Sequence, residues 1–249
     1  MGTISGKQKT RRRVQFLFVP LSFFLVEVFA FFFLSLNTEE FRPAQLWPLA
    51  FGALWAAILS GFVRLLPAKA GRVAYGILYF AAAIYAAVET GYFYLFSEMM
   101  WLSDFRYASE GSDYFSVLLS YPIGWWLGLA ALIVQGVVIL VNFPGWRQKW
   151  STGIAAAAVA VAASVGAACL PQAVFLQDGD IRYASSDYGR VQSAEAAYDN
   201  MFNAHRLYQV CGLYQTLEKD IYKNGIYPLT PSCAAAQKAG KAEINAYFA

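Results

Sequence analysis

Apolar residues gather in five long runs along this chain, at residues 14–36, 46–66, 73–96, 117–141 and 153–170. A helix needs roughly 20 apolar residues to cross the hydrocarbon core of a bilayer. The first four runs reach that length, whereas the fifth is mostly Ala and Val and inserts with a marginal free energy. The pattern predicts an all-α integral membrane protein with a five-helix transmembrane bundle over residues 14–170.

The first run is predicted to stay in the mature protein. It is longer than the apolar core of a cleavable signal peptide, which has about 7–15 residues. It ends in Ser35, Leu36 and Asn37, without an Ala-x-Ala cleavage site. We therefore interpret it as a signal anchor.

Charged residues in the short loops alternate in sign along the chain. Residues 1–13 are basic, as are the loops after the second and fourth runs, whereas acidic residues predominate after the first and third. Because Lys and Arg mark cytoplasmic loops, residues 1–13 are predicted to be cytoplasmic. Five crossings then place the tail, residues 171–249, outside the cell.

Composition narrows the function classes. The chain is 58% hydrophobic and only 14% charged, against about 25% charged residues in typical soluble domains. A soluble enzyme and a disordered chain are excluded. The net charge of +3 forms no basic stripe, so no nucleic-acid partner is expected. Three Cys and one His exclude a disulfide framework and a histidine-rich metal site.

Two polar segments adjoin the predicted helices. Residues 97–116 mix aromatic and acidic side chains and are predicted to lie along the membrane surface, as an interfacial helix rather than a plain loop. In the tail, residues 193–222 have helical spacing that Gly212 interrupts or ends. A second helix is expected over residues 233–248. Such short helices bury little by themselves, so the tail is predicted to be a linker that packs on something else.

Two acidic residues fall inside predicted crossings. Glu27 and Glu89 are costly at membrane depth and are expected to face the bundle interior or a cavity. A hydrogen-bonded structural role is favoured for Glu27. Glu89, with Tyr92 and Tyr94, could equally border an outward cavity that admits a lipid headgroup. All four residues are therefore candidate lipid contacts.

The cysteines and the histidine offer little further chemistry. Cys211 and Cys233 could pair in an oxidising compartment, closing a loop worth about 3 kcal/mol, or could be two free thiols. Cys169 is expected to be a packed small residue. His205 has no partners at metal spacing, so no metal or other cofactor is predicted within this chain.

The tail also carries short motifs of a known family. These are residues 197–202, then Arg206-Leu207-Tyr208, Gly212-Leu213-Tyr214 and Asp220, with residues 243–248 at the close. Together with the predicted topology they resemble the membrane domain and linker of lipoteichoic acid synthase-like phosphoglycerol transferases, in the alkaline phosphatase and sulfatase superfamily. The architectural likeness spans the chain; the motifs cover only about residues 195–248.

The resemblance implies a membrane anchor in the plasma membrane of a bacterium. The family's enzyme moves phosphoglycerol from a lipid to a cell-envelope polymer, using a Thr nucleophile and a divalent metal such as Mn or Mg in an extracellular domain. None of those catalytic residues can be placed here. The chain ends inside an apparent helix, which favours truncation before that domain. Membrane lipids, including a lipid-linked phosphoglycerol donor, are the implied partners. The alternative is a complete, non-enzymatic scaffold or subunit of an envelope complex; a small transporter is least favoured.

Overall fold

The computed structural model describes residues 6–36, 46–104, 120–143, 158–170, 198, 201, 203–231 and 233. Every regular element in these ranges is helical, as the apolar runs predict. In chain order the labelled elements are α1 (Gly6–Phe31), the π-helix η1 (Phe32–Leu36), α2 (Trp47–Leu65), α3 (Ala68–Phe96), α5 (Ile123–Val141), α9 (Ala204–Asp220), the π-helix η4 (Ile221–Ile226) and the 3-10 helix η5 (Tyr227–Leu229).

Four helices are long and apolar enough to cross a membrane, over Leu17–Ser35, Trp47–Leu65, Ala68–Phe96 and Ile123–Val141. The expectation of a membrane protein is thereby confirmed. The fifth predicted run is represented by the shorter apolar helix Ala158–Leu170. Residues 153–157 lie outside the described part, so the count of five crossings and the inside–outside topology stay predictions.

Several helix boundaries differ from the predicted ones. α1 begins at Gly6, eight residues before the predicted run. α3 begins directly after Pro67, five residues before the predicted run, and carries Lys69 and Arg72 in its first turns. The apolar pattern ended at those charges, but a helix continues through charged residues wherever its end reaches water. α5 begins after Pro122, because proline fixes a backbone angle suited to a helix start and disfavours the helix before it. Of the predicted interfacial helix, residues 97–116, the structure describes 97–104, where only residues 102–104 are helical, in a 3-10 turn. Residues 105–116 lie outside the described residues.

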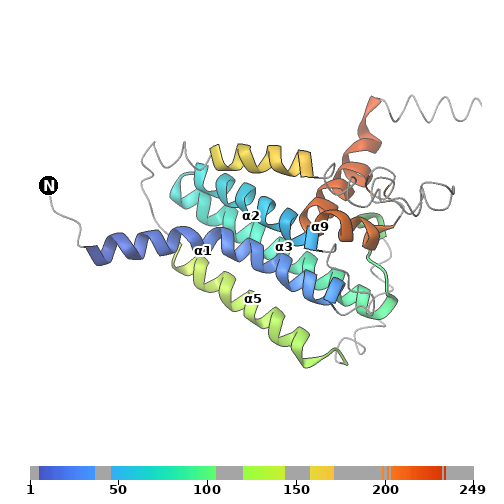
Figure 1. Cartoon of the computed structure of the whole chain (residues 1–249), viewed down its shortest axis with the longest axis horizontal. Helices are drawn as coiled ribbons and strands as arrows, with labels where there is room; N and C mark the ends of the chain where they lie inside the picture. The colour runs from blue at the N-terminus through green and yellow to red at the C-terminus, as the bar shows by residue number, and fades with distance from the viewer. Residues whose placement is uncertain are drawn as a thin grey trace, which may run out of the picture.

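α1 is the central helix of the bundle and packs against α2, α3 and α5 (Figure 1). Its Phe23 meets the rings of Tyr75 and Tyr79 edge-on, with centroids 5.6 and 6.0 Å away. The two tyrosine hydroxyls donate to Ser22 Oγ and to the Leu132 carbonyl, so no buried hydroxyl of this ring cluster is left unpaired. This cluster joins α1, α3 and α5 at the centre of the bundle.

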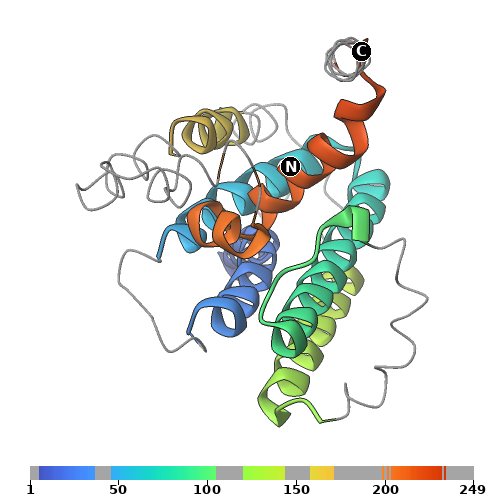
Figure 2. The same ribbon diagram turned by 90° about the vertical axis from the view of Figure 1, so that its right-hand side faces the viewer.

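α9 lies across one end of the bundle, where α1 finishes, α2 begins and α3 finishes (Figures 1 and 2). We call this the α9 end. The helix packs mainly on α2 and also on α1. The predicted linker therefore does pack on something else, and that partner is the bundle of its own chain.

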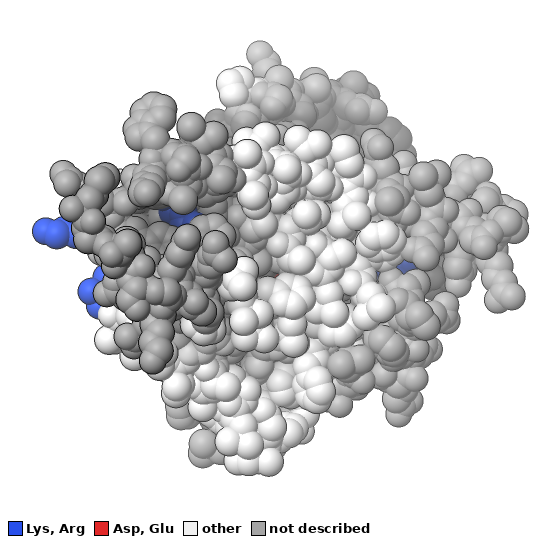
Figure 3. Space-filling model, turned by 60° about the vertical axis from the view of Figure 1, so that its left-hand side comes forward, with Lys and Arg blue, Asp and Glu red and all other residues white. Residues whose placement is uncertain are grey.

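The surface of the bundle is largely uncharged where it is described. Figure 3 shows a broad face without acidic side chains, with Lys and Arg visible only toward its margins. Large apolar side chains are exposed along α5, among them Leu127, Val134, Val138 and Val141. Exposure of this kind is what a helix facing lipid requires.

Candidate functional site

The carboxyl group of Glu27 is fully buried and accepts a hydrogen bond from the linker. Both of its oxygens accept the backbone N–H of Leu213 in α9, at 3.0 and 3.1 Å. A carboxyl group without partners would be costly in this apolar surrounding, and the linker amide supplies one. Glu27 is therefore hydrogen-bonded within the protein. Its exposed fraction is 0% in the folded chain.

Two glycines leave the space that Glu27 occupies. Gly212 has φ 75° and ψ 178° and interrupts α9 there. A Cβ on Gly212 would lie 2.8 Å from the Pro48 carbonyl oxygen and 3.0 Å from Glu27 Oε1. A Cβ on Gly52 of α2 would overlap the Glu27 side chain itself. We call Glu27, Gly52, Gly212 and Leu213 the Glu27 site.

Further hydrogen bonds fix α9 just after its kink. Tyr214 donates its hydroxyl to the Phe23 carbonyl at 2.6 Å, and Trp55 donates its indole N–H to Gln215 Oε1 at 2.9 Å. Just after the kink, Thr216 donates its hydroxyl to the Gly212 carbonyl at 2.7 Å. The first two pairs join α9 to α1 and α2 through groups far apart in the sequence.

The kink of α9 lies between the first turn of α2 and the Glu27 side chain of α1. Glu27 is about two helical turns, or roughly 12 Å, inside the Ser35 end of its candidate span. The two ends of α9 lie nearer the ends of the long helices: His205 Nε2 is 3.0 Å from the Leu34 carbonyl, and Asp220 accepts the N–H of Leu102, beyond α3. α9 therefore lies against the start of α2 and the second half of α1, with its kink at Gly212 beside Glu27.

His205 takes part in the docking of α9. Its ring centroid is 4.4 Å from that of Phe93. Burial lowers the pKa of the imidazole, with the Leu34 carbonyl opposing that shift. Within the described residues, no group of three or more His, Cys, Asp or Glu side chains is placed to hold a metal ion.

Two further carboxyl groups, those of Glu89 and Asp220, hold the segment that follows α3. Glu89 Oε2 accepts the N–H of Met100 at 3.0 Å, and Asp220 Oδ2 accepts that of Leu102 at 2.7 Å. Both side chains are buried. Burial raises the pKa of Asp220, while hydrogen bonds from Leu102 and Asn224 lower it. Glu89 thus joins α3 to this segment, and Asp220 joins the end of α9 to it.

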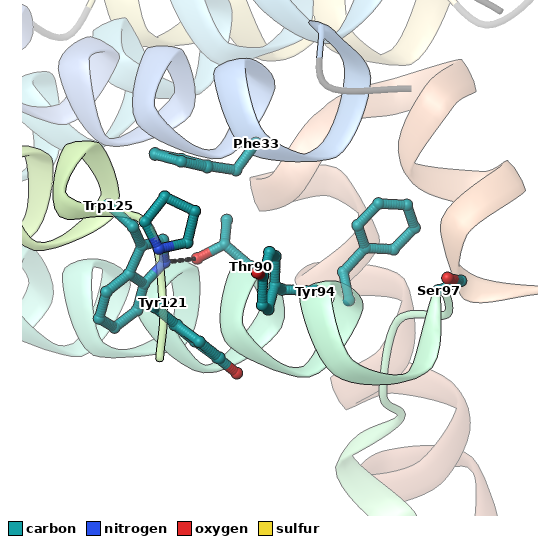
Figure 4. Close-up of a pocket in the computed structure, with 8 residues that line it drawn as sticks. Phe33, Thr90, Tyr94, Ser97, Tyr121 and Trp125 are labelled. Atoms are coloured by element: carbon teal, nitrogen blue, oxygen red, sulfur yellow. Dashed lines mark hydrogen bonds between the residues drawn. The ribbon is translucent and has the colours of Figure 1, made fainter. Parts of the chain in front are cut away.

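A small pocket of about 160 Å³ opens between η1, the end of α3 and the start of α5, at the α9 end (Figure 4). Thr90, Tyr94 and Tyr121 bring hydroxyl groups to its lining, and Trp125 donates its indole N–H to Thr90 Oγ1 at 2.9 Å. Of the four candidate lipid contacts, only Tyr94 lines it. Tyr92 packs its ring against that of Phe96 instead, tilted by 37° and with centroids 4.5 Å apart.

All three cysteines are free thiols in this structure. Cys211 is fully buried, and its Sγ lies 3.2 Å from the Leu207 carbonyl and 3.8 Å from Thr216 Oγ1. Cys233 is also buried, whereas Cys169 at the end of Ala158–Leu170 is exposed and not packed as expected.

Sequence analysis identified Glu27 and Gly212 separately but not as one site. The available signal was a glycine inside an otherwise helical run, together with an acid inside a crossing. Trp55, Gln215 and Pro48 carried no signal of their own. Residues 199–200, 202 and 243–248, which carry part of the family resemblance, lie outside the described residues.

No family model, curated protein or solved structure matches this chain. Function is therefore argued from the site and from the resemblance alone.

Proposed function

We propose that this chain is the membrane anchor and linker of a lipoteichoic acid synthase-like transferase, with the catalytic domain following outside these 249 residues. In this proposal the enzyme moves phosphoglycerol from a lipid to a cell-envelope polymer. The α9 end faces the outside of a bacterial plasma membrane, and residues 1–13 are cytoplasmic.

The observation that carries the proposal is the docking of α9. Several described residues of the family-like motifs take part in it. Leu207 and Tyr208 are buried against the bundle, Gly212 and Leu213 form the Glu27 site, and Asp220 holds the segment after α3. A short motif serving as an interhelical contact is expected of a linker whose position matters.

A docked linker has a clear physical role in such an enzyme. A flexible tether lets a domain sample a volume set by its length, whereas a fixed one holds it at one height and orientation. A lipid donor presents its headgroup only at the membrane surface. Holding the catalytic domain there raises the effective concentration of headgroups at its active site.

The pocket at the α9 end supports a contact with the lipid partner. Its aromatic lining, with the hydroxyl-bearing side chains of Tyr94 and Ser97, suits a polyol headgroup beside apolar chains. In this proposal it holds a lipid near the linker, while the chemistry, with its Thr nucleophile and Mn or Mg, belongs to the following domain. The 249 residues alone are then inactive.

The test begins with the native protein in its source membrane. Its intact mass is expected to be well above 27.6 kDa, and the purified protein should release diacylglycerol from a fluorescent phosphatidylglycerol. A native mass matching this chain, with no release, would overturn the proposal and favour the scaffold alternative.

Paired variants of that native protein then test the linker. Gly212→Ala disturbs the Glu27 site, whereas a Cβ at Gly225 meets nothing within 4 Å. We expect Gly212→Ala to lower diacylglycerol release and Gly225→Ala to leave it unchanged. Equal activity in both variants would show that docking of α9 is irrelevant to the reaction.

A further inference from the structure

The nine residues after α9, in η4 and η5, expose large apolar side chains. Ile221, Tyr222, Ile226 and Leu229 are 43, 53, 51 and 85% exposed. Their spacing of one, five and eight residues from Ile221 places them along one stripe of a helix. Soluble surfaces seldom carry so dense an apolar stripe without a partner.

The polar side chains of the same segment are engaged by the protein. Asn224 donates its amide to Asp220 Oδ1 at 2.5 Å. Lys223 donates its ammonium to the Met201 carbonyl at 3.2 Å and lies 5.9 Å from the centre of the Trp101 ring. The polar edge, although exposed, is therefore hydrogen-bonded to protein, and these contacts leave the apolar stripe free.

The segment begins at the level where the long helices end. Asp220, its neighbour, is hydrogen-bonded to Leu102, shortly beyond the end of α3 at Phe96. From there η4 and η5 run across the α9 end and away from α9, rather than along the bundle (Figures 1 and 2). This level corresponds to the headgroup region of a bilayer around the bundle, where Tyr side chains are enriched.

Other exposed apolar residues stand around the bundle at the same end. They are Leu46 before α2, Tyr94 and Phe96 at the end of α3, and Ile123 at the start of α5, at 50, 47, 44 and 73% exposure. These residues and the stripe belong to different helices and sides. A bilayer covers all of them together, whereas a single protein partner would cover one side.

We propose that residues 221–229 are an interfacial membrane contact, with Ile221, Tyr222, Ile226 and Leu229 inserted at the headgroup boundary of the leaflet at the α9 end. The partner is the lipid surface itself. The linker is then held twice, by protein through Asp220 and by lipid through the stripe. This inference goes beyond the proposed function and does not depend on any catalytic domain.

Site-directed spin labelling of the 249-residue chain tests it, in nanodiscs of phosphatidylcholine and phosphatidylglycerol. Cys169 and Cys233 are replaced by Ser, and the fully buried Cys211 is kept. Nitroxides are attached through Ile226→Cys and Leu229→Cys. Val134→Cys, on the exposed side of α5, gives the lipid reference, and Lys223→Cys, on the polar edge, is the matched control.

The readout is the collision rate of each label with oxygen, which partitions into lipid, and with a water-soluble nickel complex. We expect the ratio of oxygen collisions to nickel-complex collisions at residues 226 and 229 to be several-fold higher than at residue 223. It should approach the ratio measured at the lipid reference, residue 134. Strong collisions with the nickel complex at residue 229 would place the stripe in water and overturn the proposal. Weak collisions with both reagents would mean that protein covers it, and would overturn it equally.

Discussion

Gly212 is the residue at which docking of the linker can be tested most directly. Its φ of 75° and ψ of 178° belong to a region that is essentially restricted to glycine. A non-glycine residue there costs roughly 1–3 kcal/mol in backbone strain alone. An alanine Cβ would also lie 2.8 Å from the Pro48 carbonyl oxygen and 3.1 Å from its Cα, and those backbone atoms of α2 cannot rotate away.

Gly212→Ala should therefore loosen α9 from the bundle. At about 1.4 kcal/mol per tenfold change, the strain corresponds to roughly 5- to 150-fold more frequent opening. Opening of α9 breaks its contacts with α1 and α2, among them the hydrogen bond from Leu213 to Glu27. The more frequent opening should therefore be confined to α9 and the residues that it contacts. α3 and α5 pack with α1 through the tyrosine cluster and should keep their stability.

Hydrogen–deuterium exchange of the chain in nanodiscs measures this directly. Peptides over residues 204–220 should exchange faster in Gly212→Ala by that factor, while peptides of α3 should not change. Gly225→Ala is the control, because its Cβ would meet open space. Unchanged protection of residues 213–220 in Gly212→Ala would refute the assigned role of the kink. Faster exchange everywhere would show that the whole bundle, rather than the linker, depends on it.

Three further predictions follow from the same contacts. Glu27→Ala leaves the N–H of Leu213 buried without a partner and should lower the free energy of unfolding by about 1–3 kcal/mol. Glu27→Gln keeps an acceptor oxygen, so its melting temperature in detergent should lie closer to that of the wild type. Equal losses of stability in the two variants would contradict the role of the hydrogen bond. In Gly52→Ala the new Cβ overlaps the Glu27 side chain, so overpacking should lower the free energy of unfolding by about 1–3 kcal/mol and the melting temperature with it. Gly124→Ala, whose Cβ meets nothing within 4 Å, should not lower the melting temperature. Because burial lowers the pKa of His205, the folded chain binds fewer protons there, so its contribution is complete above a pH of about 6.5 and is lost below it. The melting temperature should thus fall more between pH 7 and pH 5 in wild type than in His205→Gln; identical pH profiles would exclude His205 as the cause. The raised pKa of Asp220 acts with the opposite sign and is common to both proteins.

The long helices could be predicted from the sequence because their signal is local. A run such as residues 46–66 is apolar over the thickness of a bilayer, whatever it packs against. Helix ends were less well determined. Lys69 and Arg72 ended the apolar pattern but not α3, since a helix and its membrane-spanning part need not have the same limits.

The Glu27 site could be predicted only in pieces. The acid inside a crossing marked Glu27, and the glycine inside a helical run marked Gly212. Their meeting joins residues on α1 and α9 that are far apart in the chain, and no periodicity within either segment encodes it. The polar cost of burying Glu27 requires a partner, but many backbone amides could have supplied one.

The sequence by itself therefore determined that this is a helical membrane protein, with a less apolar tail and two acids that need partners. Only the tertiary structure decided that the tail packs against the end of the bundle, that Glu27 accepts the N–H of Leu213, and that Glu89 holds the segment after α3. The physical reason is that crossing a membrane depends on summed local hydrophobicity. Docking depends on matched shapes and single hydrogen bonds between distant residues, such as the absent Cβ of Gly212 against Pro48.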